Sequence, residues 1–324
     1  MLGGREALGG PPPAAAPPVL PDPGLYCRLR TASGNAANMT VGSVDHARNG
    51  FDPVRLLTDF DGGEVSTDRS GRTVREYRFT AVAKEIEVAP DVFFPAWTYN
   101  ERVPGPTIRA TEGDRIRIHF ANGSEHPHTI HFHGMHPASM DGVPGAGEVY
   151  PGDEFTYDFI AEPFGTHLYH CHSLPLKNHI HRGLYGAFIV DPLQGRPEAN
   201  EMVMVLNGFD TNFDGENEVY AVNTVAFAYA ERPIQIQAGQ LQRAHVVNVT
   251  EFDPINSIHL HANFFNVYRS GTSLEPSEFV DVISFMQAER HMLEFAYREP
   301  GRFMFHAHQA EFVELGWMSF FEVI

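Results

Sequence analysis

Cysteine is nearly absent from this chain, which has only Cys27 and Cys171 among its 324 residues. Two cysteines are too few for the disulfide framework that stabilises many small secreted proteins. Cys27 lies in a segment without regular pattern, and we interpret it as an incidental thiol. Cys171 instead stands between two histidines in "HCHSLPLKNHIHRGL", which makes it a candidate metal ligand.

Basic residues are also scarce, with 23 Lys and Arg against 41 Asp and Glu and a formal net charge of −18. This balance argues against nucleic acid and anionic membrane surfaces as partners, and it is mildly compatible with cationic substrates. No apolar run approaches the length of a membrane span. The first 24 residues contain no continuous hydrophobic stretch, so no ordinary secretory signal is visible.

Long helical patterns are missing, whereas short alternating runs separated by turns are frequent. The stretches "VREYRFTAVAKEIEV" and "DRIRIHFAN" alternate polar and apolar residues, as half-buried strands do. Turn signals such as "VPGPT" and "YPGDEF" lie between such runs. We therefore expect an all-β chain, preceded at residues 1–64 by an irregular extension that is partly disordered at its start.

The chain contains an internal repeat. Residues 108–122 match residues 234–248, "TIHFHG" matches "SIHLHA", and "PFGTHLYHCH" matches "EPGRFMFHAH". The sequence therefore predicts two homologous β domains, at residues 65–193 and 200–324.

Each copy of the repeat contributes two His-x-His pairs. Residues i and i+2 of a strand point to the same side, about 7 Å apart along the backbone, so each pair can offer two imidazoles together. Four such pairs in matching order predict a polynuclear metal site. They are His131/His133, His170/His172, His259/His261 and His306/His308.

Cys171 distinguishes the first copy from the second, which has Ala307 in the matching position. The cysteine points away from His170 and His172, so we expect it to serve a different metal ion. His128 and His179 are its natural partners, because two imidazoles and a thiolate with a weak or absent axial group form a blue-copper site.

These motifs resemble those of multicopper oxidases, and more narrowly of two-domain, laccase-like members with type 1 copper in the first domain. The resemblance covers residues 75–324 and rests on "HPHTIHFHG", "HCHSLPLKNHIHRGL", "HLHA" and "HAH". It implies two cupredoxin-like Greek-key β-sandwich domains. It also implies an enzyme that couples one-electron oxidation of a phenol, aromatic amine or metal ion to the four-electron reduction of dioxygen to water.

Carried over residue by residue, the resemblance implies four copper ions per subunit. Type 1 copper would bind His128, Cys171 and His179, with Leu184 at the axial position as a non-ligand that raises the potential. Type 2 copper would bind His131 and His259. One type 3 copper would bind His133, His172 and His308, and the other would bind His170, His261 and His306. The spacing from Cys171 to His179 is closer to that of copper nitrite reductases than to that of three-domain laccases.

Several further roles follow from the resemblance. Asp141, in an "MDG" context, is expected to assist proton delivery, and Glu311 is a weaker candidate for the same role. Electrons from the donor are expected to arrive near an exposed edge of His128 or His179. His181 is interpreted as a surface or supporting imidazole rather than an extra ligand. The other histidines are taken as structural, with His136 and His167 near enough to the ligands to support them; these others are His119, His126, His136, His167, His245 and His291.

Each predicted domain carries half of the cluster ligands, so a first domain must face a second domain. A head-to-tail ring allows this between neighbouring chains, and two-domain relatives resemble such rings, commonly homotrimers with clusters at the interfaces. The alternative, in which the two domains of one chain face each other, stays open. Relatives are usually exported to the periplasm or the extracellular space, which gives the expected localisation here.

Three alternatives compete with the oxidase. A copper nitrite reductase has the same fold but needs one catalytic copper with three histidines, which leaves His133, His172, His261 and His308 without a role. A non-enzymatic electron-transfer protein needs only the type 1 set. A closed structural zinc site does not form from a lone cysteine and histidines at these separations.

Overall fold

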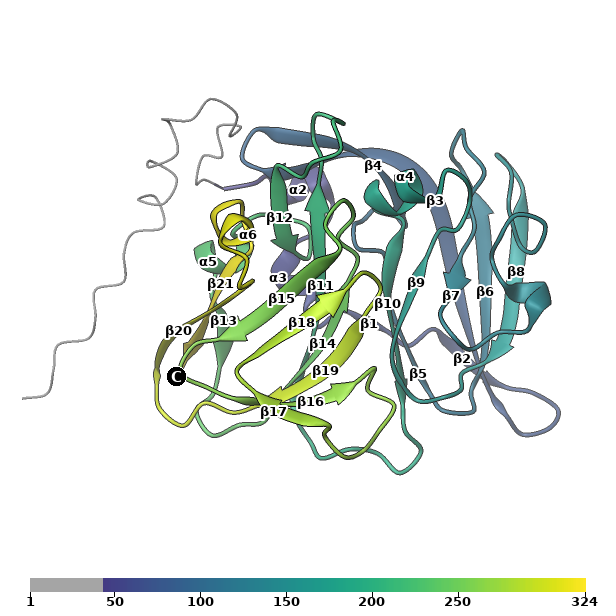
Figure 1. The fold of residues 1–324 in the computed structure, drawn as a ribbon. Helices are drawn as coiled ribbons and strands as arrows, with labels where there is room; N and C mark the ends of the chain where they lie inside the picture. The colour runs from purple at the N-terminus through teal and green to yellow at the C-terminus, as the bar shows by residue number, and fades with distance from the viewer. Residues whose placement is uncertain (1–42) are drawn as a thin grey trace, which may run out of the picture.

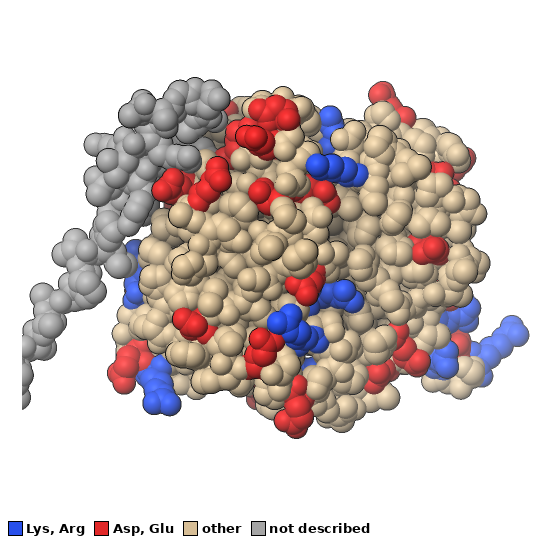
Figure 2. All heavy atoms as spheres, in the orientation of Figure 1, with Lys and Arg blue, Asp and Glu red and all other residues tan. Residues whose placement is uncertain are grey.

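The computed structural model describes residues 43–324, so Cys27 and the start of the extension lie outside the described part. Two β-sandwiches lie side by side, the first formed by the blue and teal strands of Figure 1 and the second by the green and yellow strands. The predicted all-β architecture with two sandwiches is confirmed. Acidic side chains are spread over the face drawn in Figure 2.

The first sandwich packs a sheet of order β1-β5-β10-β9-β7 against a sheet of order β2-β3-β6-β8, with β4 added to β3. Alternation produces the packing: in β6 the side chains of Ile116, Ile118 and Phe120 are buried and those between them are partly exposed. The strands are β1 (Phe60–Asp61), β2 (Glu64–Thr67), β3 (Thr73–Ala89), β4 (Val92–Tyr99), β5 (Thr107–Thr111), β6 (Arg115–Asn122), β7 (His131–Phe132), β8 (Glu154–Ile160), β9 (Gly165–His170) and β10 (Tyr185–Asp191).

The second sandwich packs a sheet of order β12-β11-β14-β19-β16-β17 against a sheet of order β13-β21-β20-β15-β18. Its strands are β11 (Asn200–Phe209), β12 (Val219–Val222), β13 (Ile234–Ile236), β14 (Gln242–Asn248), β15 (Ile255–Leu260), β16 (Phe265–Arg269), β17 (Glu278–Val280), β18 (Val282–Met286), β19 (Arg290–Phe295), β20 (Gly301–His306) and β21 (Met318–Val323).

The internal repeat is visible in the strand pairing. The first copy pairs β5 with β10 in parallel and β6 with β8 antiparallel, and the second pairs β13 with β21 and β14 with β19 in the same senses. The matching turns need a left-handed backbone, which glycine adopts without strain. Gly113 has φ 87° and Gly239 has φ 76°.

Helices are short, and none in residues 43–324 is long and apolar enough to cross a bilayer. They are α2 (His46–Asn49), α3 (Pro53–Leu56), the 3-10 turn η1 (Ala138–Met140), α4 (Leu176–His181), α5 (Ala228–Glu231) and α6 (Ala310–Glu314).

Part of the segment assigned to the irregular extension is ordered. The Asp45 side chain caps α2 by accepting from two backbone N–H groups, and Phe51 and Leu56 are buried. The Asn49 side chain bonds both the N–H and the carbonyl of Glu87 in β3. These contacts hold the segment against the first sandwich, and the ion pair of Asp52 with Arg232 joins it to the second.

The two sandwiches share a buried contact. Strand β9 packs on β14 and β19, and Leu168, Val205 and Val247 belong to one apolar cluster. At its edge Arg109 and Arg243 both bind Glu201. The second sandwich therefore presents its β14/β19 sheet to the first, and its β15/β20 sheet forms the opposite layer.

Candidate metal centre

His128, Cys171 and His179 form a buried cluster in the first sandwich. Cys171 directly follows β9, His179 lies in α4, and His128 is in the loop before β7. The Cys171 Sγ lies 3.2 Å from Nδ1 of His179 and 3.8 Å from Nδ1 of His128, and the two Nδ1 atoms are 3.2 Å apart. The sequence-predicted type 1 residues are thus brought together.

Burial controls the protonation of this cluster. It lowers the pKa of His128 to about 3 and that of His179 to about 4, and it raises the pKa of the Cys171 thiol. Neutral imidazoles are ready to coordinate, and a metal ion would take the place of the thiol proton. The Thr129 N–H donates to Sγ at 3.3 Å. A donor set of two imidazoles and one thiol fits copper.

Leu184 lies next to this cluster. The N–H of Cys171 donates to the carbonyl of Leu184 at 2.9 Å, and both side chains belong to the same core. Leu184 is therefore held beside Cys171, and its axial assignment stays a prediction.

His181 does not join the cluster. It is buried, with its ring packed against Phe94 and Phe252, and its Nε2 accepts the N–H of Asp210 at 3.0 Å. This agrees with a supporting role and corrects the alternative of a surface position.

The second cluster consists of His131, His133, His170 and His172. Strand pairing sets His131 opposite His170. The Nδ1 of His170 donates to the carbonyl of Cys171, which leaves Nε2 as the free ligand atom of His170. This Nε2 lies 3.0 Å from Nε2 of His133. This separation suits two imidazoles on one first-row ion, since zinc–nitrogen bonds measure about 2.0–2.1 Å.

The strand pairing bears on the expected ligand grouping, which stays a prediction. His133 was grouped with His172, and in the structure its Nε2 lies 3.0 Å from Nε2 of His170. The reason is geometric: antiparallel pairing of β7 with β9 brings His133 close to His170, whereas the ring of His172 packs against His131.

The third cluster repeats this geometry in the second sandwich. His259 pairs with His306 across β15 and β20, and Nε2 of His261 lies 2.9 Å from Nε2 of His306. Nδ1 of His306 donates to the carbonyl of Ala307. His308 completes the set at the surface, where it and His261 are exposed.

In each of the two histidine sets, a side-chain hydroxyl accepts a hydrogen bond from the backbone N–H of the last histidine. Thr129 Oγ1 accepts the N–H of His172 at 2.6 Å, and Ser257 Oγ accepts the N–H of His308 at 2.7 Å. Sequence reasoning aligned Thr129 with Ser257 in the repeat but gave neither a role.

Asp141, the residue expected to assist proton delivery, contacts a histidine. Nδ1 of His131 donates to the Asp141 carbonyl at 2.6 Å, and the carboxylate lies 3.1 Å from the same nitrogen and 3.5 Å from Nε2 of His136. The second sandwich has an equivalent that sequence reasoning missed, because Nδ1 of His259 donates to the carbonyl of Asp281 at 2.8 Å. Asp281 is 22 positions from its histidine, so no local motif marks it.

Glu311 lies exposed in α6. Within residues 43–324 its carboxylate has no hydrogen bond to a histidine, and its charge acts instead on the buried Tyr220, whose pKa it helps to raise. The geometry gives this proton-relay candidate less support than Asp141.

The two half-clusters do not meet within one chain. Among the described residues, the groups of adjacent metal-ligating side chains combine histidines of the first sandwich or of the second, but never of both. The first set opens into a cavity of about 320 Å³ whose other wall carries Asn248, Glu251 and Gln287 from the second sandwich. The second set lies on the opposite sheet, β15/β20 (Figure 1).

The Cys171 cluster has no imidazole edge at the surface. His128 is 0% exposed and His179 is 2% exposed, which corrects the expectation that a donor meets one of them directly. The indole of Trp97 covers both rings, with centroid separations of 5.4 and 4.8 Å. Sequence reasoning missed Trp97, which a hairpin brings in from 31 positions before His128.

The histidines that were taken as structural make hydrogen bonds to, or pack against, neighbouring residues. Thr166 bonds the buried His245, Pro163 accepts from His167, and His136 lies beside Asp141. His126 packs on Trp97, His119 bonds Thr156, and His291 packs on Phe285.

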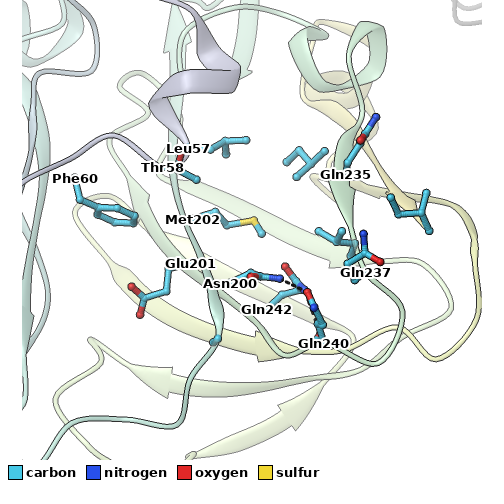
Figure 3. Close-up of a pocket in the computed structure, with 14 residues that line it drawn as sticks. Leu57, Thr58, Phe60, Asn200, Glu201, Met202, Gln235, Gln237, Gln240 and Gln242 are labelled. Atoms are coloured by element: carbon cyan, nitrogen blue, oxygen red, sulfur yellow. Dashed lines mark hydrogen bonds between the residues drawn. The ribbon is translucent and has the colours of Figure 1, made fainter.

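A separate hollow of about 690 Å³ lies between the N-terminal segment and β13 (Figure 3). Its lining is rich in amides, including Asn200, Gln240 and Gln242, and it contains no histidine or cysteine. It therefore lacks the imidazole and thiol groups that form the three clusters.

Comparisons with known proteins identify copper oxidases, in agreement with the clusters of metal-ligating side chains. Family models described as multicopper oxidase match residues 82–195 and 197–324. A solved structure described as a multicopper oxidase is 55% identical, with TM-score 0.86, and the match covers 87% of this chain and 100% of that one. Blue copper oxidase from Nitrosomonas europaea is 28% identical, with TM-score 0.68, over 77% of this chain and 86% of that one.

Nitrite reductases are related as well. The copper-containing nitrite reductase of Neisseria gonorrhoeae is 29% identical over 62% of this chain and 50% of its own length. The chain thus spans about half, or less, of the length of the first curated relatives it matches. Because the two family models together match most of the chain, it belongs to the multicopper oxidase family.

Proposed function

We propose that this protein is a laccase-like oxidase that couples one-electron oxidation of a reducing substrate to reduction of dioxygen to water. The observation that carries the proposal is the set of His-x-His pairs in two matching half-clusters, together with a separate cysteine–histidine cluster. Copper bound in these places supplies one-electron acceptance at the thiolate site and dioxygen reduction at the histidine sites.

Four copper ions per chain would occupy the clusters. His128, Cys171 and His179 hold type 1 copper beside Leu184, and His131 and His259 hold type 2 copper. The nitrogen distances favour one type 3 ion on His133, His170 and His308, and the other on His172, His261 and His306. Cys171 directly joins His170 and His172, so the backbone connects the electron acceptor to both type 3 ions.

We further propose that neighbouring chains complete the trinuclear cluster, most simply in a head-to-tail homotrimer. The half-cluster of the second sandwich is exposed, and apolar side chains surround it. Phe279 is 66% exposed and stacks on Phe264, and Val282 and Met286 are exposed on β18. Such an apolar face suits burial against another subunit, and the matching occupant is the first half-cluster of a second copy.

Proton delivery to the cluster is assigned to Asp141, whose carboxylate lies beside His131 and His136. It is partly exposed, so it can exchange protons with solvent while contacting a ligand imidazole. Glu311 is retained as a secondary candidate.

Copper nitrite reduction is the second candidate, because the relatives include nitrite reductases. It would use one catalytic copper and leave His133, His172, His261 and His308 unexplained. A non-enzymatic electron-transfer role would leave both half-clusters unexplained. Export to the periplasm or cell exterior, and domain limits of 65–193 and 200–324, stay predictions.

The test is copper content per chain, measured with visible and EPR spectra of copper-loaded protein and followed by oxygen uptake with a panel of donors. Four ions, an intense thiolate-to-copper absorption, one type 2 EPR signal and an EPR-silent coupled pair are expected. Two ions without a coupled pair, together with nitrite consumption, would overturn the oxidase proposal in favour of the nitrite reductase.

A further inference from the structure

Trp97 lies between the Cys171 cluster and solvent. It is partly exposed, whereas the imidazoles of His128 and His179 are buried beneath it. Its ring contacts both imidazoles, through T-shaped arrangements. A donor at the surface is therefore separated from the ligands, and the indole is the conjugated group that bridges this gap.

Two contacts hold Trp97 in this place. Its backbone N–H donates to the carbonyl of Arg182, the residue that follows α4, at 2.9 Å. The Arg182 guanidinium also lies 5.0 Å from the Trp97 ring and 4.9 Å from the ring of Phe213. Cation–π contacts of this kind orient aromatic rings. The exposed ring of Phe213 thus shares the Arg182 guanidinium with Trp97.

A competing route runs through Leu174, which hydrogen-bonds His179 through its backbone and is 73% exposed. Its side chain is saturated and provides no π surface for a donor to contact. Trp97 combines exposure, conjugation and contact with both ligand rings, so it is the better electron path.

We propose that Trp97 is the residue through which electrons pass from the donor to the copper held by His128, Cys171 and His179, an inference that rests on the function proposed above. In each event the donor loses one electron, copper(II) becomes copper(I), and Trp97 ends in its original redox state. A phenolic donor releases its proton to solvent in the same event. Planar donors contact the Trp97 edge and the neighbouring Phe213 ring.

The test compares Trp97→Leu and the conservative Trp97→Phe with a matched control, Phe93→Leu. Phe93 lies on the same strand, is exposed and carries Arg48 over its ring, but it has no contact with a ligand histidine. Each copper-loaded variant is first checked for thiolate–copper absorption and type 1 potential. The rate at which a hydroquinone bleaches that absorption without oxygen is then measured by stopped flow.

At unchanged potential, Trp97→Leu should be reduced at least an order of magnitude more slowly, Trp97→Phe should be intermediate, and Phe93→Leu should match the wild type. Reduction of an intact Trp97→Leu site at the wild-type rate would overturn the inference.

A second readout needs no turnover. The chain has two tryptophans, and Trp317 is fully buried in the second sandwich. Copper binding to the metal-free protein should quench the emission of Trp97, and this quenched fraction should be missing from Trp97→Phe. Unchanged emission while the blue absorption develops would contradict the inference. Wild-type protein that never develops the blue absorption contradicts the proposed function and, with it, this inference.

Discussion

His261 and His306 bring their Nε2 atoms to within 2.9 Å of each other, and His261 is exposed at the surface of the chain. Under the proposed assembly, the first half-cluster of a second copy supplies the remaining ligands. Residues 43–324 leave the apolar face around His261 and His306 exposed.

Replacing Phe279 by arginine should therefore weaken assembly. A charge at a buried interface loses its hydration without gaining a partner, so the variant should sediment as smaller species and lose the type 2 EPR signal while keeping the blue absorption. Val65→Arg, at an exposed apolar residue of β2, is the matched control. An unchanged oligomer in Phe279→Arg would place the interface elsewhere.

Leu184→Met should lower the type 1 potential. A thioether at the axial position can donate electron density to copper, which leucine cannot, and the swap preserves volume, so the fold should tolerate it. Redox titration of the blue absorption measures the shift. A potential that is unchanged or raised would show that residue 184 is not axial to the metal.

Thr129→Val should destabilise the protein by about 1–3 kcal/mol, because the partly buried backbone N–H of His172 loses its acceptor. Urea unfolding of the metal-free protein checks this value. Thr129→Ser keeps the hydroxyl and serves as the control, and Ser257→Ala should reproduce the effect beside His308. Equal stability of Thr129→Val and Thr129→Ser would argue against the hydrogen bond.

The metal-free protein should lose stability as pH falls below 6.5. Burial lowers the pKa of His245 to about 3 and that of His170 to about 4, from 6.5 in the unfolded chain. Between these values the unfolded chain binds more protons, so the free energy of unfolding rises with pH in that range. The stabilisation that comes from these buried, neutral histidines is complete above pH 6.5 and is lost as the pH falls towards 4.

Urea unfolding across this pH range measures the slope. The slope should be shallower for His245→Asn, which removes one buried imidazole. A wild-type protein whose stability is flat over the range would contradict the assignment.

The internal repeat and the four His-x-His pairs could be predicted from the sequence because both depend on local spacing. Strand period alone places His131 and His133 on one side, and the glycines of the repeat mark equivalent turns. Local spacing does not decide whether His133 lies nearer to His170 or to His172, because that depends on side-chain reach across two paired strands.

The contacts of Asp281 and Trp97 could not be predicted from the sequence, for a related reason. Asp281 reaches His259 through the pairing of β15 with β18, and Trp97 reaches His179 through the β3–β4 hairpin. Neither contact leaves a motif in the sequence. Residues 43–61 were assigned to an irregular extension because their few apolar side chains lack a period, although Phe51 and Leu56 are buried.

Complementation between two variants tests whether the first half-cluster of one chain and the second half-cluster of another form a working site. His133→Ala breaks the first half and His261→Ala breaks the second, so each variant alone should lack oxidase activity. Co-expressed as mixed oligomers, they should regain part of it together with the type 2 EPR signal, because one interface joins two intact halves. Mixed oligomers that stay inactive while both parents retain the blue absorption would contradict a cluster shared between chains.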